Sequence, residues 1–194
     1  DTDDKKKILK TIDKEITTSI LASEISKFKN SLMSIEDAKQ SSPDQYYTRL
    51  ADIYEKYQSY LEKNNLVDFD DLLLLTYYLL DKFPDLAKQT SQRYQYIMVD
   101  EYQDTNELQY KLLKLLTSTH KNLCVVGDDD QSIYGWRGAN IKNILEFKNQ
   151  FKDTKIVKLE YNYRSTKKIL EAANNLIEHN RNRLGKILKA TKEE

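Results

Sequence analysis

Two carboxylates in the middle of the chain have the spacing of a metal-dependent hydrolytic site. In the segment VDEYQDTN, residues 99–106, Asp100 and Glu101 directly follow an apolar run of β-favouring residues. At such a strand end one carboxylate can hold a hydrated Mg²⁺ while the next orients an attacking water. Acidic pairs also occur in ordinary solvated loops, so the pair alone leaves that alternative open. Gln103 and the helix predicted after it favour the hydrolytic interpretation.

A second segment, VGDDDQSIYGWRGAN at residues 126–140, carries residues suited to a phosphate group. Gly127 ends another predicted strand, where the absent Cβ lets the backbone approach a ligand closely. The amide of Gln131 can donate to a phosphate oxygen and accept from a water. We therefore expect Gln131 to sense the terminal phosphate of a nucleotide.

Aromatic residues of the same segment indicate a different ligand. Tyr134 and Trp136 lie two positions apart among glycine and polar residues, with Arg137 beside them. Aromatic rings next to arginine in an exposed loop suit stacking on unpaired bases, worth roughly 1 to 3 kcal/mol per base. Packing of the two rings in the core explains the pair equally well, and the sequence leaves both interpretations open.

A third polar cluster lies in LEYNYRST, residues 159–166, after a further predicted strand. Arg164 could reach the same cleft and stabilise charge on a transferring phosphate, as an arginine finger does. Tyr163 beside it could stack on an adenine. A lone Tyr-Arg pair is ordinarily a surface pair, but here it is the third strand end in succession that carries functional residue types.

Alternating strands and helices must position these three clusters. Strands are predicted over residues 94–101, 122–128 and 154–160. Helices are predicted over residues 67–84, 105–118, 140–151 and 165–180. Pro84 ends the first of these helices and starts another short one. The alternation predicts an α/β fold with a parallel sheet, whose functional groups gather at the carboxyl ends of the strands. Cys124 is expected as a small buried residue of the second strand rather than a nucleophile.

The first 65 residues predict helices alone. Isoleucines recur at every fourth position in residues 8–20, and apolar residues follow the same period in residues 47–61. Residues 39–44, KQSSPD, form a loop that ends by capping the second of these helices. The chain is thus expected to be an all-helical part followed by an α/β part that holds the chemistry.

The composition is that of a well-hydrated protein with a real core. The 194 residues are 39% hydrophobic and 32% charged, and no apolar run approaches the roughly 18 residues of a membrane span. A single cysteine excludes an internal disulfide and a cysteine-based zinc cluster, which fits a cytoplasmic location. Residues 141–194 hold 13 basic against 7 acidic residues, which suits either an anionic partner or lysines that solvate amphipathic helices.

Taken in order and at their spacings, the three segments resemble motifs II, III and IV of the UvrD, Rep and PcrA group of superfamily 1 DNA helicases. VDFDDLL at residues 67–73 is similar to a further element of that family. The resemblance covers residues 66–180 directly and extends more loosely to the N-terminus. It implies an ATP-driven motor that moves 3′ to 5′ along single-stranded DNA. Such a motor separates duplex at single-strand/duplex junctions, in DNA repair or replication.

The resemblance also implies roles in ATP hydrolysis. Asp100 would bind Mg²⁺, and Glu101, at the same metal site, would activate the hydrolytic water. Gln131 would couple the γ-phosphate of ATP to the DNA site, Arg164 would contact that phosphate, and Tyr163 would lie near the adenine. These five residues are the expected catalytic and ATP-binding set.

The DNA-binding set implied by the resemblance is separate. Tyr134 and Trp136 would stack on single-stranded bases, with Arg137 nearby as a further contact. Tyr161 departs from the family, which often has Gln at that position. No membrane partner is expected.

The resemblance divides the chain into three parts. Residues 1–66 resemble the helical 1B subdomain, residues 67–160 the C-terminal half of the RecA-like domain 1A, and residues 161–194 the start of domain 2A. The chain contains no G-x-x-x-x-G-K-[ST], the loop by which P-loop NTPases hold phosphate. It also begins with Asp rather than Met. We therefore expect a piece of a longer helicase, inactive as an ATPase by itself.

Two other functions stay open at this point. A non-catalytic module that binds single-stranded DNA or a partner protein could retain a helicase scaffold, although it would have little use for the carboxylates, glutamine and arginine of the ATP site. A helicase and nuclease fusion of the AddA or RecB kind would show its nuclease only after residue 194.

Overall fold

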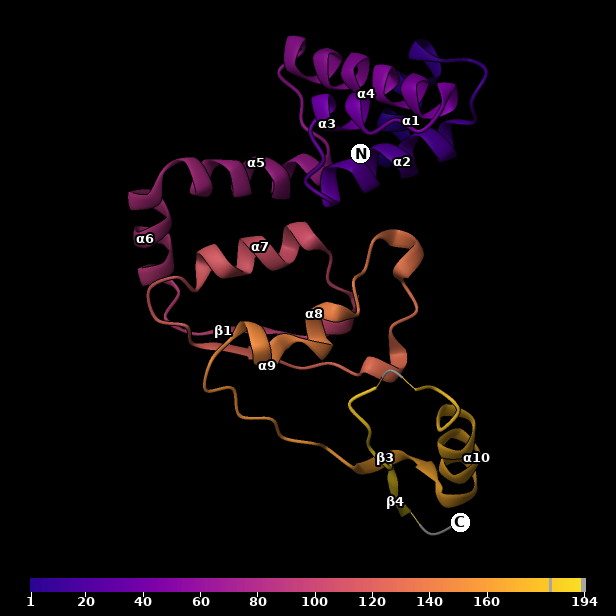
Figure 1. Cartoon of the computed structure of the whole chain (residues 1–194), viewed down its shortest axis with the longest axis vertical. Helices are drawn as coiled ribbons and strands as arrows, with labels where there is room; N and C mark the ends of the chain where they lie inside the picture. Colours follow the sequence, from indigo (N-terminus) through magenta and orange to yellow (C-terminus); the bar gives the residue numbers. More distant parts are fainter. Residues whose placement is uncertain (182, 193–194) are drawn as a thin grey trace.

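The computed structural model describes residues 1–181 and 183–192, with every side chain in these ranges except that of Arg137. Figure 1 shows an elongated arrangement in three parts. A helical group lies at one end, a middle part holds further helices and a two-stranded sheet, and a C-terminal part with a second two-stranded sheet lies at the other end. Within the described residues, no helix combines the length and the apolar character needed to cross a bilayer.

The helical group contains helices alone, as predicted. Its elements are α1 (Thr2–Ile12), α2 (Thr18–Asn30), α3 (Ile35–Gln40) and α4 (Gln45–Lys63). Side chains of α1, α2 and α4 form its core, including the buried Leu9, Leu21 and Tyr57. Asp44 caps α4 by accepting the backbone N–H of Tyr47 at 3.0 Å, which confirms the predicted capping loop.

The isoleucine repeat in residues 8–20 does not form one continuous helix. Asp13 ends α1 and accepts the backbone N–H groups of Glu15 and Ile16, at 2.9 and 2.8 Å. Arg49 of α4 pairs with the same carboxylate at 2.5 Å. A side chain that satisfies nearby backbone donors competes with propagation of the helix, which explains the break between α1 and α2.

The middle part begins with helices that confirm the predictions for residues 67–84 and 105–118. They are α5 (Phe69–Lys82), α6 (Pro84–Arg93) and α7 (Glu107–Leu116). A capping box starts α5, because Asp68 accepts the backbone N–H of Asp71 (2.9 Å) and Asp71 accepts that of Asp68 (3.1 Å). Pro84 occupies the first turn of α6, where its missing N–H needs no partner.

Two short parallel strands complete the sheet of the middle part. β1 (Ile97–Val99) pairs with β2 (Leu123–Val125), so both strands lie where the sequence predicts them. Because the strands are parallel, the loops that follow them leave the sheet at the same edge. The chain therefore has an α/β fold, built from helices and small parallel sheets.

The third predicted strand, residues 154–160, is wrong. The strand in this region is β3 (Tyr161–Thr166), which pairs with β4 (Lys189–Lys192) in a second parallel sheet. Val157 and Leu159 are exposed, so the apolar side chains of the predicted strand have no sheet to pack against. The chain instead crosses from the middle part to the C-terminal part through this segment (Figure 1).

The predicted helix over residues 140–151 is also interrupted. It consists of α8 (Lys142–Leu145) and α9 (Phe147–Gln150), which meet at Glu146. Phe147 packs edge-on against the buried Tyr102, with ring centroids 5.4 Å apart, so tertiary packing overrides a continuous helix. The helix predicted over residues 165–180 is observed as α10 (Lys167–Ile177).

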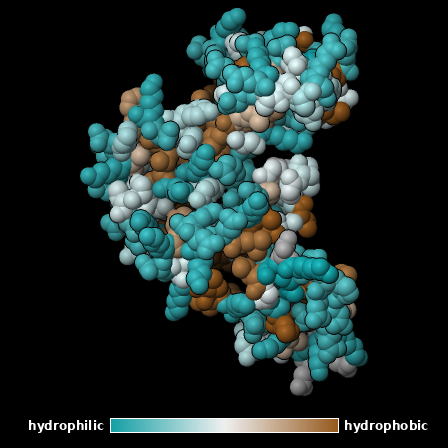
Figure 2. Space-filling model, viewed as in Figure 1, coloured by the Kyte–Doolittle hydropathy of each residue, from teal (hydrophilic) through white to brown (hydrophobic). Residues whose placement is uncertain are grey.

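Cys124, expected to be buried, is exposed, as is Met98 beside it in the strand register. Side chains alternate across a strand, so the neighbouring Val99 and Val125 face the other side, where they are half-buried. One face of the β1–β2 sheet is thus covered and the other is open. Figure 2 shows hydrophobic side chains gathered on the middle part, whereas the helical group is mainly hydrophilic on the same side of the molecule.

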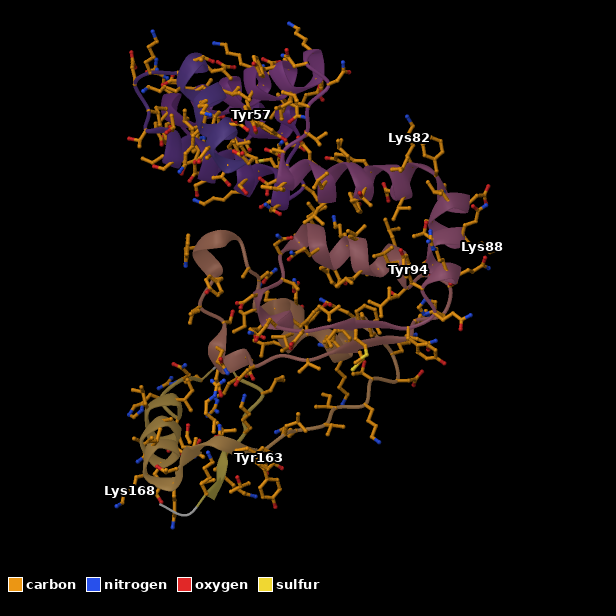
Figure 3. All side chains as sticks on the ribbon, turned by 180° about the vertical axis from the view of Figure 1, so that it is seen from behind. Tyr57, Lys82, Lys88, Tyr94, Tyr163 and Lys168 are labelled. Atoms are coloured by element: carbon orange, nitrogen blue, oxygen red, sulfur yellow. The ribbon has the colours of Figure 1, made fainter. Side chains whose placement is uncertain are left out.

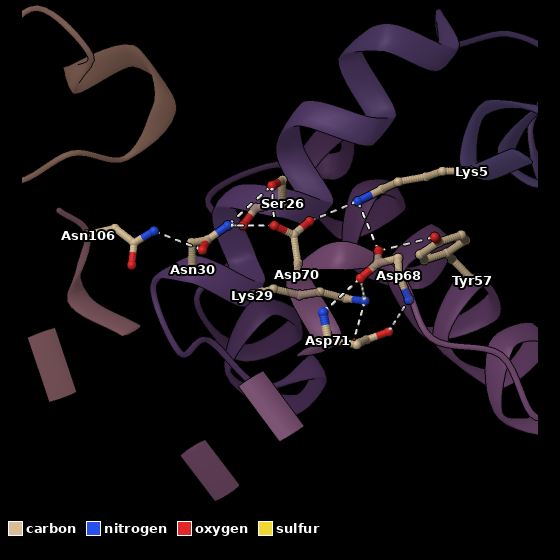
Figure 4. Close-up of polar contacts among 9 residues, drawn as sticks. All are labelled: Lys5, Ser26, Lys29, Asn30, Tyr57, Asp68, Asp70, Asp71 and Asn106. Carbon is tan, nitrogen blue, oxygen red and sulfur yellow. Dashed lines mark hydrogen bonds and ion pairs between the residues drawn. The ribbon is translucent and has the colours of Figure 1, made fainter. Parts of the chain in front are cut away.

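A buried ionic cluster joins the helical group to α5 (Figure 4). Lys29 of α2 is fully buried, and its ammonium contacts Asp71 at 2.7 Å and Asp68 at 3.0 Å. Lys5 of α1 contacts Asp68 and Asp70, both at 3.0 Å. Because a buried charge is strongly unfavourable without a partner, these contacts fix how α5 leaves the helical group.

The same cluster extends to the segment before α7. Asp70 accepts hydrogen bonds from Ser26 Oγ and Asn30 Nδ2, each at 2.9 Å. Asn30 Oδ1 accepts from Asn106 Nδ2 at 2.8 Å. Asn106 in turn caps α7 by accepting the backbone N–H of Gln109 at 2.9 Å. A continuous chain of hydrogen bonds therefore connects the helical group to the end of VDEYQDTN.

Replacing Lys29 with Met should lower the free energy of unfolding by about 3 to 5 kcal/mol, because Asp68 and Asp71 would be buried without their cation. Lys27→Met is the matched control, since Lys27 lies on the same helix with a side chain 44% exposed and pairs with Glu24. We expect this control to change stability by less than about 1 kcal/mol. Urea unfolding measures both values, and equal stability of the two variants would contradict the assignment.

Acid should weaken the same cluster. Burial alone would raise the pKa of Asp68, but the charges of Lys29 and Lys5 outweigh it and lower the pKa to about 2. This pKa lies below the ordinary 3.8, so the stabilisation is complete above about pH 4 and is lost as the pH falls through 2. Melting temperatures across that range measure the loss. Asp68→Asn should flatten the dependence, and an unchanged slope in that variant would refute the prediction.

Candidate functional site

Asp100 and Glu101 follow β1 at the edge of the sheet. Both side chains are exposed, and Asp100 Oδ1 accepts the backbone N–H of Glu101 at 2.9 Å. Glu101 has φ 50° and ψ 40°, a left-handed conformation that residues other than glycine rarely adopt. Such strain persists only where surrounding contacts hold it, and it is concentrated at functional sites.

The two carboxylates line a hollow of 380 Å³ beside α7. Apolar side chains of that helix, Leu112, Leu113 and Leu116, also line it. Mg²⁺ takes one or two carboxylates and completes its shell with water and phosphate oxygens. The exposed pair of carboxylates after β1 therefore fits a magnesium ion in the donor atoms that it offers.

Gln103 joins these carboxylates to the loop after β2. The residue is 1% exposed. Its Nε2 donates to Glu101 Oε2 at 2.7 Å and to Asp104 Oδ2 at 3.4 Å. Its Oε1 accepts the backbone N–H of Asp128 at 3.0 Å. A single buried amide therefore spans the ends of the two paired strands.

Gly127 is required by this packing. A Cβ at this position would lie 2.7 Å from Gln103 Oε1 and 3.2 Å from the backbone nitrogen of Tyr102, closer than side chains normally approach. The sequence predicts a close approach here by a ligand, whereas the group that approaches in the structure is the Gln103 side chain. The glycine signals a close contact without revealing its partner, because that partner lies on another strand end.

The acidic residues 128–130 hold the C-terminal part. Asp130 accepts from Arg183 Nε at 3.0 Å and Nη2 at 2.6 Å. Asp129 Oδ2 accepts the backbone N–H of Leu184 at 2.7 Å. The three carboxylates lie within 4.8 Å of one another, a spacing that a cation could use, but protein donors occupy them here. We therefore assign them a structural role, which local sequence does not indicate because the partners lie more than 50 residues away.

Asp128 connects this contact to Gln131. Its carboxylate accepts from Lys186 Nζ and from Gln131 Nε2, the latter at 2.7 Å. Burial alone would raise the pKa of Asp128, but the hydrogen bonds from Lys186 and Gln131 outweigh it and lower the pKa. The amide of Gln131 is thus held by a carboxylate that also binds the C-terminal part.

Tyr134 and Trp136 lie on the loop between β2 and α8, with ring centroids 6.3 Å apart. Trp136 is 63% exposed and Tyr134 is also exposed, so neither ring is packed in the core. Trp136 lines a pocket of 470 Å³ together with residues of α1 and α2, among them Lys6 and Lys27. An exposed indole near lysines suits an anionic ligand with flat rings. The side chain of Arg137 lies outside the described part of the structure.

Tyr163 and Arg164 lie on β3 in the C-terminal part, away from the helical group (Figure 3). Both side chains are exposed, and Asn162 Oδ1 accepts the backbone N–H of Arg164 at 2.9 Å. The expectation that three strand ends share one sheet edge is therefore wrong. The first two share an edge, whereas β3 belongs to the second sheet, because its partner strand comes from residues 189–192.

The sequence is similar to known proteins over most of its length. Residues 2–152 match the family model described as the UvrD/REP helicase N-terminal domain. Over 159 residues the chain is 51% identical to the ATP-dependent DNA helicase PcrA of Staphylococcus epidermidis and 50% identical to that of Staphylococcus aureus. Each alignment covers 82% of this chain and 22% of the relative, so the chain spans less than a quarter of the relatives' length. The chain belongs to the UvrD/REP helicase family.

Proposed function

We propose that this chain is part of an ATP-dependent helicase that couples ATP hydrolysis to 3′ to 5′ movement on single-stranded DNA and to unwinding of duplex. The observation that carries the proposal is the junction after β1 and β2, where Gln103 and Asp128 link Glu101 to Gln131. A connected unit of this kind suits an enzyme in which the state of the phosphate must be sensed. The staphylococcal relatives, each named as an ATP-dependent DNA helicase, support the same activity.

In this proposal Asp100 binds Mg²⁺, and Glu101, at the same metal site, activates the attacking water. Both carboxylates are exposed at the sheet edge and line one hollow, which supports the assignment. Bound Mg²⁺ would neutralise charge that develops on the phosphates. The task of this chain's own residues is to hold the ion and to orient the water.

The nucleotide contacts are proposed to come from both sheets. Gln131 and Arg164 contact the γ-phosphate, and Tyr163 lies near the adenine. Tyr163 and Arg164 are exposed on β3, and Gln131 is tied to the C-terminal part through Asp128 and Lys186. A nucleotide between the two sheets would therefore meet groups from each.

The three parts of the structure support the proposed subdomains. We assign residues 1–66 to a helical 1B subdomain, residues 67–160 to the C-terminal half of a RecA-like domain 1A, and residues 161–194 to the start of domain 2A. The helical group ends with α4 at Lys63, and β3 begins at Tyr161, close to both boundaries. The open face of the β1–β2 sheet suits coverage by further parts of a longer protein.

Single-stranded DNA is proposed to pass along the pocket lined by Trp136. Trp136 and Tyr134 would stack on bases, with Arg137 as a further contact, and Lys6 and Lys27 would lie near phosphates. Junctions between single strand and duplex are the expected substrates. Binding should weaken as salt rises, because released counterions contribute to the affinity.

The 194-residue chain alone should show no DNA-stimulated ATP hydrolysis, because it lacks the loop whose backbone amides and lysine hold phosphate. Phosphate release with and without single-stranded DNA measures this. The full-length protein, assayed in parallel, should hydrolyse ATP, and circular dichroism should show that the chain is folded. DNA-stimulated phosphate release by the chain alone would contradict the prediction.

Trp136→Ala should weaken binding of a labelled oligothymidylate by roughly 5- to 150-fold, the loss of one stacked base at about 1 to 3 kcal/mol. Fluorescence anisotropy measures the affinity. In the 194-residue chain, which has one tryptophan, quenching of its fluorescence by DNA reports directly on this site. Tyr96→Ala removes an aromatic ring that is 79% exposed but lies outside the pocket, and it should bind like the unchanged protein. Equal losses in both variants would argue against stacking at Trp136.

A further inference from the structure

We infer that Gln103 is a positioning residue, which holds the carboxylate of Glu101 in place and ties its orientation to the backbone at Asp128. This inference rests on the proposed role of Glu101 in ATP hydrolysis. The juxtaposition that carries it is a buried amide between a strained turn after β1 and the glycine-to-aspartate step after β2.

The hydrogen bonds determine which way the amide of Gln103 points. The backbone N–H of Asp128 can only donate, so it must meet Oε1 of the amide. The NH₂ group is thereby turned toward the carboxylates of Glu101 and Asp104, which accept when ionised. A reversed amide would set oxygen against oxygen and donor against donor. The amide therefore has one favourable orientation, and that orientation serves Glu101.

The side chain of Glu101 depends on this contact. Among the described residues, the Gln103 amide is the one protein donor to the carboxylate of Glu101. The side chain of Glu101 is exposed, and an exposed carboxylate without restraint would sample several rotamers. A hydrogen bond of 2.7 Å to an ionised acceptor restrains it. A group that orients water needs such restraint, because small misplacements slow the reaction strongly.

The other end of Gln103 is equally constrained. The absence of a Cβ at Gly127 leaves the space that Oε1 occupies. Ser132 Oγ donates to the backbone oxygen of Gln103 at 3.3 Å, and Asp128 also binds Gln131. A movement of the loop that carries Gln131 would therefore shift the amide and, with it, Glu101. In this way the phosphate-sensing loop and the water-orienting carboxylate are coupled through one side chain.

The test uses the full-length protein with saturating single-stranded DNA. Gln103→Glu keeps an oxygen for the N–H of Asp128 and almost the same volume, but removes the donor to Glu101. Gln103→Met removes both hydrogen bonds at similar volume. Both variants should lower kcat for ATP hydrolysis about 10- to 100-fold, as loss of contacts that orient a functional group does. The KM for ATP should change less than about threefold, because no phosphate contact is removed.

Gly127→Ala disturbs the same contact by an independent route, since its Cβ would displace the Gln103 oxygen. Alone it should lower kcat by a similar factor. Combined with Gln103→Met it should lower kcat by a smaller factor than it does alone, because both changes disturb the Gln103 contact, although the approach of the Cβ to Ile144 and Tyr102 remains. Ser34→Ala is the control: it removes another side-chain oxygen that accepts a backbone N–H, from Asp37 at 3.0 Å, outside the hollow that Asp100 and Glu101 line, and should leave kcat within about twofold.

Glu101→Gln distinguishes failure of the proposed role of Glu101 from failure of the positioning role of Gln103. If this variant keeps the unchanged kcat, the proposed function of Glu101 fails. If Glu101→Gln lowers kcat while a folded Gln103 variant hydrolyses ATP at the original rate, only the positioning role is overturned. The positioning role would also be overturned if the effects of the Gly127 and Gln103 changes on kcat multiply fully in the double variant. If melting curves show that the Gln103 variants are unfolded, the kcat of Gly127→Ala alone tests the positioning role.

Discussion

The ammonium of Lys29 must be compensated within the protein, because it is completely buried against the carboxylates that begin α5. This requirement brings α2 to the start of α5. Lys5 of α1 and Tyr57 of α4 reach Asp68 as well, the latter by a hydrogen bond of 3.1 Å. Three helices of the helical group thus converge on one short acidic turn. The direction of α5, and hence the place of α7 against which it packs, follows from that convergence.

The same constraint reaches the candidate site through amide side chains. Asn30 holds Asn106 at the start of α7, and the buried Asn143 donates to the backbone oxygen of Thr105 at 3.1 Å. The loop that follows β1 is therefore held from the helical group and from α8. Gln103 holds the same loop from the β2 side. A site on loops can be well ordered when the supporting groups come from helix termini and paired strands.

Local sequence predicted the elements that depend on local chemistry. Pro84 predicted where α5 ends, and the apolar runs before Asp100 and Gly127 predicted β1 and β2. The predictions of element boundaries and strands were wrong where residues distant in the sequence determine the local structure. Asp13 interrupts the isoleucine repeat with the help of Arg49, and β3 is formed with a strand that lies more than 20 residues further on. The functional residue types of the site could be predicted from the sequence. The connecting role of the Gln103 amide could not, because its carboxylate acceptors and its backbone donor lie at two different strand ends.

The ion pairs between residues 128–130 and the C-terminal part reduce the number of unpaired basic side chains. Residues 141–194 carry an excess of basic side chains, but Arg183 and Lys186 are already neutralised by Asp130 and Asp128. Cations that are paired inside the protein release no counterions from a DNA backbone. If DNA binds as proposed, the dependence of its affinity on ionic strength is set by the cations that are not paired within the protein. Part of the basic excess of residues 141–194 therefore forms ion pairs that hold the C-terminal part to the middle part.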